Sequence, residues 1–463
     1  MSIAFVAQGF GLLLGVLQSL LVPKLLTVEN YAYWQLFIFY IGYVGFFTLG
    51  LSDGVYLIFG GQSRSSVDKR SINSQFAVEV TCQLLFSGLI IILALLGKFG
   101  QDREFVLLCV SLQLVLQNTS TYIMYVLQAM NETKSSSYNA IIARIAYLLP
   151  LGVMLLLRVE SYKPYVIAYV ASSVVSVAYG LSRVADFRSA GLLSPKDALA
   201  ESILSVRVGI KLMFANLASQ LIIGVARFVI DAVWGIETFG QLSLSLSMVT
   251  FFMAFMAQAS MVLFPALRQS RSEEIRTFYH LARDFMGLFF PLLYLLYVPL
   301  VWVLSLWLPQ YVSSFAYLTY LIPICVFDSK MDITCTTLLK VMRQERRLLV
   351  INCIAAAVCA CGTFVGAYLF HSIHFIIGSL VVTIIGRSVY SEMLISKKLG
   401  LGTSPIPFEE IAITALFIVF SSTMPPLVSM LCFFGTYVVF LVLNKGRAAE
   451  LLRALKTVSI RRG

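Results

Sequence analysis

Long apolar runs recur along the chain, and short polar segments separate them. Ser2–Val22 carries no charged residue, and comparable runs follow at about 34–59, 76–97, 105–128, 138–157, 165–182, 210–234 and 241–264. An α-helix needs about 20 apolar residues to cross the hydrocarbon of a bilayer. Each run is therefore predicted to be one membrane-spanning helix.

Three further charge-free runs, 285–327, 348–386 and 411–444, are too long for a single span. Each is interrupted by proline or by short polar residues, at Pro309-Gln310, His371–His374 and Pro425-Pro426. Each run is therefore predicted to be a hairpin of two spans. The total is fourteen, and an even number places both termini on the same side of the membrane.

Composition supports an all-α integral membrane protein. The 463 residues are 59% hydrophobic and 12% charged, whereas soluble domains are about 45–50% apolar and about 25% charged. A soluble multidomain enzyme is excluded because too little polar surface is left for water. A disordered chain is excluded because Phe (34) and Tyr (22) are abundant.

The net charge of +11 is explained by how the chain is oriented in the membrane. It therefore gives no reason to expect a nucleic-acid partner. With both termini in the cytoplasm, 25 of the 34 Lys and Arg fall in the inside loops and the C-terminal segment, and five fall outside. Such asymmetry is the positive-inside rule. The four tryptophans, Trp34, Trp234, Trp302 and Trp307, are then predicted at the outer interface.

The longest inside connection divides the spans into two groups. We expect an N-terminal lobe of six spans at 1–183, a cytoplasmic linker at 184–209 and a second six-span lobe at 210–396. Two further spans at 397–444 and a basic cytoplasmic tail at 445–463 follow. Val28–Ala32 resembles Ile236–Gly240 about 208 residues later, and a Gln-Leu pair follows both, which favours a parallel repeat.

Four segments near the N-terminus resemble the polysaccharide-repeat-unit flippases, which are O-antigen transporters of the Wzx type. These segments are Val22–Leu26, Glu29–Tyr31, Trp34–Leu36 and Leu49–Gly54. That family belongs to the multidrug/oligosaccharidyl-lipid/polysaccharide (MOP) exporters, with the multidrug (MATE) transporters and the lipid II flippase. Ala32 departs from the glycine usual in the family, whereas the repeat copy has Gly240.

The resemblance implies two six-helix lobes around a central cavity. It implies translocation of an undecaprenyl-diphosphate-linked oligosaccharide across the bacterial cytoplasmic membrane by alternating access, with other polysaccharide-assembly membrane proteins as candidate partners. Two alternatives stay open at this point. One is a membrane-embedded polysaccharide polymerase or ligase, which the short outside loops disfavour, and the other is a MATE-like multidrug antiporter.

Searches for chemical motifs give no catalytic site. The sequence has no G-x-x-x-x-G-K-[ST] phosphate loop, and no catalytic residue, metal site or cofactor is expected. Any energy for transport is therefore expected from an ion gradient.

Polar side chains inside spans are costly and need either protein or water around them. Gln113, Gln117 and Gln128 share one face of the fourth span, and Asn216 and Gln220 share one face of the seventh. These stripes either line a cavity or form interhelical hydrogen bonds.

Three arginines inside spans are candidate contacts for an anionic headgroup. Arg227 lies four residues before Asp231, so the two either neutralise each other or leave the guanidinium to bind phosphate. Arg387 lies far from the membrane edge and needs a cavity or a partner on another helix. Arg144 is close enough to the inner end of its span to snorkel.

Acidic residues near the inner ends of spans are candidates for ion coupling, together with Asp231. Asp328 and Asp332 share a face of the tenth span, where they either bind a cation, meet solvent or pair with Arg387. Asp53 lies in the Leu49–Gly54 motif, where it either pairs with a cation or caps the following helical turn.

Overall fold

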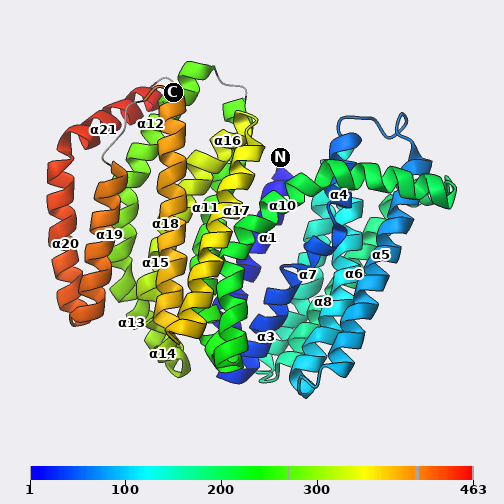
Figure 1. Ribbon diagram of the computed structural model, residues 1–463, viewed down its shortest axis with the longest axis horizontal. Coiled ribbons are helices and arrows are strands. Elements are labelled where there is room, and N and C mark those ends of the chain that lie inside the picture. The colour runs from blue at the N-terminus through cyan, green and yellow to red at the C-terminus, as the bar shows by residue number, and fades with distance from the viewer. Residues whose placement is uncertain (1, 269–270, 402–405, 461–463) are drawn as a thin grey trace. The chain divides into compact units, whose positions relative to one another are not determined.

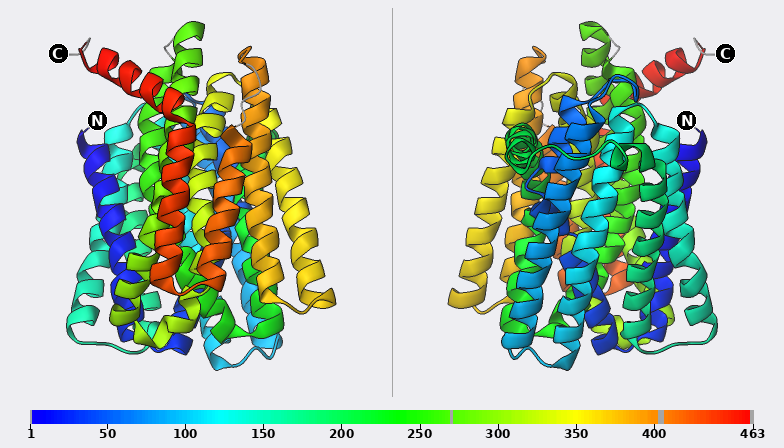
Figure 2. Two further views of the ribbon diagram at one scale, coloured as in Figure 1. Left: turned by 90° about the vertical axis from the view of Figure 1, so that its left-hand side faces the viewer. Right: turned by 90° about the vertical axis from the view of Figure 1, so that its right-hand side faces the viewer.

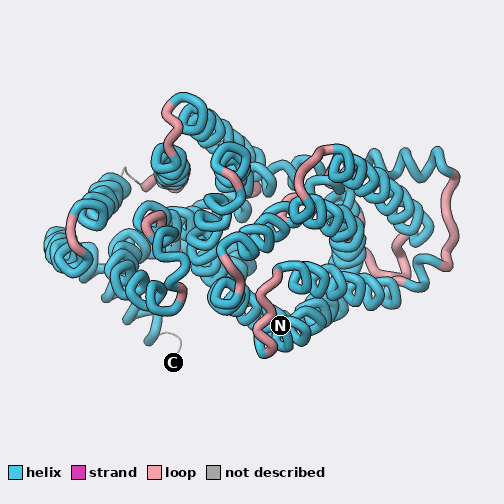
Figure 3. Tube along the Cα trace, turned by 90° about the horizontal axis from the view of Figure 1, so that it is seen from below, coloured by secondary structure: helices cyan, strands magenta, loops and turns pink. Residues whose placement is uncertain are grey.

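The computed structural model describes residues 2–268, 271–401 and 406–460. Within these ranges the chain consists of helices joined by short loops, without a β-strand (Figure 3). The all-α fold predicted from the apolar runs is confirmed. Nine helices in the described ranges are long and apolar enough to cross a membrane, or up to eleven if two bent pairs each count as one span. The total of fourteen stays a prediction.

The chain divides into two compact units, Met1–Gln220 and Leu221–Gly463. Helices α5, α6, α7 and α8 of the first unit run side by side (Figure 1). The elements of this unit are α1 (Ser2–Val16), η1 (Leu17–Leu21), α2 (Val22–Leu25), α3 (Val28–Ile41), η2 (Val44–Thr48), α4 (Leu51–Ile58), α5 (Lys69–Leu96), α6 (Gln101–Ala129), α7 (Thr133–Leu156), α8 (Tyr162–Arg183), α9 (Ala185–Arg188) and the first part of α10 (Pro195–Trp234).

The second unit contains the rest of the chain, and its three predicted hairpins break where the sequence indicates. One break lies between Trp307 and Pro309, a second between Leu369 and Ile373, and a third between Thr423 and Pro426. Its elements are the end of α10, α11 (Ile236–Arg268), α12 (Ser272–Phe289), η3 (Phe290–Leu296), α13 (Tyr297–Trp307), η4 (Pro309–Tyr311), α14 (Val312–Phe315), α15 (Leu318–Lys330), η5 (Met331–Thr336), α16 (Thr337–Val341), α17 (Glu345–Phe364), η6 (Val365–Leu369), α18 (Ile373–Lys398), α19 (Ile406–Thr423), α20 (Pro426–Leu443) and α21 (Lys445–Ile460).

The linker expected at 184–209 packs as part of the first unit. The first part of α10 lies across α5, α6, α7 and α8. In the right-hand view of Figure 2 it is seen end-on, while these four helices are seen lengthwise. Ser205 on this part of α10 donates a 2.6 Å hydrogen bond to Gln75 of α5, and both side chains are buried. The unit boundary therefore falls at Gln220, within the seventh predicted span, because the linker has its own buried contacts with α4 and α5.

The structure adds detail to two expected segments. Trp34, predicted at the outer interface, is fully buried and its ring is stacked 6.4 Å from that of Tyr147. Its large apolar surface stabilises the core of the first unit, and its position at the outer interface stays a prediction. The part of the expected tail that is described, up to Ile460, forms helix α21.

Candidate functional site

The second predicted span is broken, and the break lies at the Leu49–Gly54 motif. Helices α3 and η2 are bent by 55° from α4. Leu49 and Gly50 have left-handed backbones, with φ of 53° and 81°. A glycine favours this conformation, so the motif specifies a bend that the apolar pattern of a single span could not indicate.

The glycines around this bend also allow a close approach of two helices. A Cβ at Gly54 would overlap the carbonyl of Ser205, and a Cβ at Gly209 would overlap the carbonyl of Gly50. Backbones can approach this closely only where side chains are absent. The motif therefore fixes α10 against α4.

A cavity of about 200 Å³ lies beside this bend, within the first unit. It brings together three predicted site residues from two distant segments, namely Asp53, Asn216 and Gln220. The other lining residues are Gly42, Tyr43, Gly45, Phe46, Thr48, Ser52, Thr121, Tyr125, Met213 and Leu217.

The cavity wall contains a buried carboxylate and a buried hydroxyl next to one another. Asp53 is 8% exposed and lies in the first turn of α4, where the positive end of the helix dipole stabilises a negative charge. Ser52 is 1% exposed, and its Oγ has no hydrogen-bond partner among the described residues. A buried polar atom without a partner is costly, so this wall is suited to a polar ligand.

A buried polar network holds the part of the wall that η2 supplies. Gln83 of α5 donates to the Phe47 carbonyl (2.9 Å) and to Glu79 Oε1 (3.0 Å). Asn118 of α6 donates to the Val44 carbonyl and to Gln83 Oε1, both at 2.8 Å. These bonds fix the η2 turn, which supplies lining residues of the cavity. Sequence reasoning missed Glu79, although a carboxylate within an apolar run is itself a signal of function or of a buried network.

The predicted polar stripe of the fourth span mostly forms interhelical hydrogen bonds. Gln113 donates to Ser173 Oγ (3.0 Å) and Gln128 donates to Ser136 Oγ (2.9 Å). Gln117 donates to the Ile41 carbonyl at 3.4 Å. Thr121 of the same helix, one turn after Gln117, lines the cavity.

Arg144 packs inside the first unit. Its guanidinium lies against Gly11 of α1, so closely that a Cβ on that glycine would be 2.9 Å from Arg144 Cζ. The side chain is therefore held by contacts with a neighbouring helix.

Arg227 is directed toward the repeat motif of the second unit. Its Nη2 donates to Ser243 Oγ (2.9 Å), and its Cζ lies 5.0 Å from the centre of the Phe239 ring. Phe239 belongs to the Ile236–Gly240 repeat copy. Asp231 lies one turn further along α10 and is buried.

Arg387 has its partner within the second unit. Its Nη2 forms an ion pair with Asp328 of α15, and its Nη1 donates to Asn352 of α17 at 3.4 Å. The side chain of Arg387 is buried. Among the interpretations considered for Asp328, pairing with Arg387 is the one found, while Asp332 lies in η5 and is partly buried.

A second buried charge cluster was not predicted. Lys330 Nζ lies 2.6 Å from Glu392 Oε2 of α18 and 2.7 Å from Glu410 Oε2 of α19. Arg283 of α12 lies 4.0 Å from the other oxygen of Glu392. Four helices are thereby joined by opposite charges that are distant in sequence. No group of three His, Cys, Asp or Glu side chains in the described ranges is placed to hold a metal ion.

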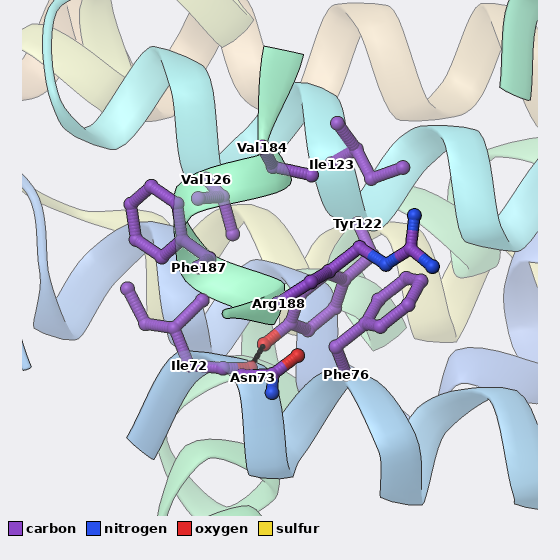
Figure 4. Close-up of a pocket in the computed structure, with 9 residues that line it drawn as sticks. All are labelled: Ile72, Asn73, Phe76, Tyr122, Ile123, Val126, Val184, Phe187 and Arg188. Carbon is purple, nitrogen blue, oxygen red and sulfur yellow. Dashed lines mark hydrogen bonds between the residues drawn. The ribbon is translucent and has the colours of Figure 1, made fainter. Parts of the chain in front are cut away.

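A second, much smaller cavity in the first unit is a packing feature. Figure 4 shows it between α5, α6 and α9, lined largely by apolar side chains such as Phe76, Ile123 and Phe187. Its volume is about 20 Å³, which is little more than one water requires. Tyr122 spans it with a 2.8 Å hydrogen bond to the Ile72 carbonyl.

Comparisons with known proteins identify the fold. No family model matches the sequence, and no curated protein matches it. The solved structure of the lipid II flippase MurJ, in an inward closed conformation, is similar with a TM-score of 0.63 and 12% identity, over 96% of this chain and 99% of that one. An inward-facing multidrug resistance MATE transporter of the MOP superfamily is similar with a TM-score of 0.59 and 12% identity, over 83% of this chain and 94% of that one.

The chain has the fold of the MOP superfamily transporters. A MOP superfamily transporter from Pyrococcus furiosus is also similar, with a TM-score of 0.52 and 10% identity, over 86% of this chain and 94% of that one. Within the second unit, Glu410 of α19 is buried in an ion pair with Lys330 of α15. The C-terminal helices α19 and α20 thus belong to the second unit.

Proposed function

We propose that this chain is a flippase that moves an undecaprenyl-diphosphate-linked oligosaccharide from the inner to the outer leaflet of the bacterial cytoplasmic membrane. The observation that carries the proposal is the fold likeness to the lipid II flippase, which extends over 96% of this chain, against 83% for the MATE transporter. The more complete match is to a protein whose cargo is a lipid-linked glycan. The sequence resemblance at Leu49–Gly54 adds weight, because this motif borders the cavity.

Translocation is proposed to occur by alternating access, with both termini in the cytoplasm. Arg144 and Arg227 remain proposed contacts for the diphosphate, because a guanidinium can donate two parallel hydrogen bonds to phosphate oxygens. Arg387, paired with Asp328, is proposed to position helices α15 and α18 for the movement. Proteins that synthesise or polymerise the same glycan are proposed partners.

The proposal is tested in a strain that lacks this gene but still makes the lipid-linked repeat unit. Repeat units on the outer leaflet are measured in spheroplasts with an impermeant lectin, with and without a plasmid copy of the gene. We expect exposure to fall in the deletion strain and to return with the plasmid, while total lipid-linked glycan does not fall. Unchanged exposure would reject the proposal, and normal exposure with altered polymer length would indicate a polymerase or ligase.

A multidrug antiporter is the second candidate, and one observation favours it. Among the described residues that line the cavity, the only charged side chain is the carboxylate of Asp53, which would attract a cationic drug. Increased sensitivity of the deletion strain to cationic drugs, with normal surface glycan, would support this function over the flippase.

A further inference from the structure

We infer that the cavity beside the η2 turn is a subsite for an uncharged sugar residue of the cargo. The inference rests on the proposed function and deepens it, because it assigns one part of the cargo to one part of the protein. The diphosphate is proposed to contact Arg144 and Arg227, outside this cavity.

The volume of the cavity suits a sugar ring better than an ion. Its volume is about 200 Å³, whereas a water needs about 10–15 Å³ and an engineered cavity of about 150 Å³ binds benzene in another protein. A bare monovalent cation would leave most of the space unfilled. A divalent cation such as Ca²⁺ is usually held by more than one carboxylate together with carbonyl oxygens, whereas Asp53 is the one carboxylate among the described lining residues.

The polar groups of the wall match the hydroxyls of a sugar. Asn216 and Gln220 each offer a donor and an acceptor, and Ser52 and Thr121 offer hydroxyls. The Ser52 Oγ is buried without a partner in the described chain. A ligand hydroxyl at this position would remove the cost of leaving that atom unpaired.

The charge of the wall excludes an anionic group. The described lining residues include no Lys, Arg or His, and Asp53 contributes a negative charge. A phosphate or a uronic acid would be repelled in a site of lowered dielectric. Tyr125 and Phe46 add apolar ring surface, which suits the less polar face of a neutral sugar.

The cavity is held in shape before any ligand binds. The Gln83 and Asn118 bonds to the Phe47 and Val44 carbonyls fix one wall, and the close packing at Gly54 fixes another. Binding therefore need not order the backbone, which lowers the cost of association.

The inference is tested on the purified full-length protein by saturation-transfer NMR. The probes are glucose, galactose, mannose, N-acetylglucosamine and N-acetylgalactosamine, with glucuronic acid as the anionic counterpart. We expect at least one neutral sugar to bind and glucuronic acid not to bind. Thr121→Val and Gln220→Leu are each expected to weaken binding about tenfold, the loss of about 1.4 kcal/mol.

Thr81→Val is the matched control. Thr81 is exposed on α5 and donates to the carbonyl four residues earlier, as Thr121 does on α6, so its replacement should leave sugar binding unchanged. Equal binding of glucuronic acid, no binding by any neutral sugar, or unchanged binding in both Thr121→Val and Gln220→Leu would overturn the inference. None of these results would alter the exposure of repeat units in the deletion strain, which tests the proposed function separately.

Discussion

Lys330 of α15 donates hydrogen bonds to both carboxylate oxygens of Glu410 of α19, at 2.8 and 2.7 Å, and both side chains are almost completely buried. Residues 80 positions apart are thereby fixed to one another inside the second unit. Removing one partner of a buried ion pair is strongly destabilising, because it leaves the other charge buried and uncompensated.

Lys330→Met is expected to destabilise the protein by about 3–5 kcal/mol, because Glu410 would be left as an uncompensated buried charge and Glu392 would keep only Arg283, at 4.0 Å. The measurement is thermal unfolding in detergent together with abundance in the membrane. Glu409→Gln is the matched control. Its partner Arg447 is 3.3 Å away and both side chains are about one-third exposed, so the expected loss is at most about 1 kcal/mol. Equal losses in the two variants would contradict the account.

Arg387→Ala is expected to reduce membrane abundance as well as translocation, because Asp328 loses its ion-pair partner. The exchange Arg387→Asp with Asp328→Arg should recover part of the lost abundance if the pair is the main role of Arg387. A coupling energy of about 1–3 kcal/mol is expected from the double-mutant cycle. Normal abundance of Arg387→Ala with lost translocation would instead place Arg387 in direct contact with the cargo.

Gly54→Ala is expected to destabilise the first unit by about 1–3 kcal/mol, because the added methyl would overlap the Ser205 carbonyl of α10. Gly152→Ala on α7 is the control, since nothing lies within 4 Å of a Cβ at that position. Alanine is the better helix former, so the control should be neutral or stabilising. Unfolding midpoints of the two purified variants distinguish these outcomes, and a neutral Gly54→Ala would show that α10 is not closely packed on α4.

Asp186→Asn tests a cluster of charges in the first unit that joins α9 to the start of α5 and the loop before it. Arg64 and Lys69 each lie 2.7 Å from the carboxylate of Asp186, and the hydrogen bond from Arg64, followed by that from Lys69, holds the pKa of Asp186 below its usual value. A lowered pKa gives stability that is present above about pH 4 and is lost as the pH falls further.

These side chains are about one-third exposed, so we expect the Asp186→Asn variant to lose at most about 1 kcal/mol at pH 7. Its unfolding midpoint should also fall less steeply than that of the wild type between about pH 4 and pH 2. Asp197→Asn, in the exposed first turn of α10, is the control. An acid-induced loss that is identical in wild type and Asp186→Asn would contradict the assignment.

Much of the fold follows from the apolar pattern, because a charge-free run of sufficient length can cross a bilayer only as a helix. Hairpin breaks such as Pro425-Pro426 are also local signals. The bend at Gly50 was not predicted, since it depends on the approach of Gly209 from a distant segment. The same reason applies to Trp34, whose burial depends on neighbours from α7 and α8.

The candidate site was only partly predictable. The sequence marks Asp53, Asn216 and Gln220 as polar residues in spans, and the structure places them around one cavity. Gln113 and Gln128 show the same pattern but form interhelical hydrogen bonds. Helical spacing identifies a shared face, whereas only the packing of other helices decides whether that face meets a cavity or a side chain.

Reconstitution tests the central claim most directly. Purified protein is placed in vesicles with a lipid-linked oligosaccharide that carries a labelled sugar, and an impermeant glycosidase is added outside. We predict that label on the inner leaflet becomes accessible to the enzyme at a rate that increases with the amount of protein and is absent with heat-inactivated protein. Inner-leaflet label that stays protected in vesicles containing folded protein, across the ion gradients tested, would contradict the account.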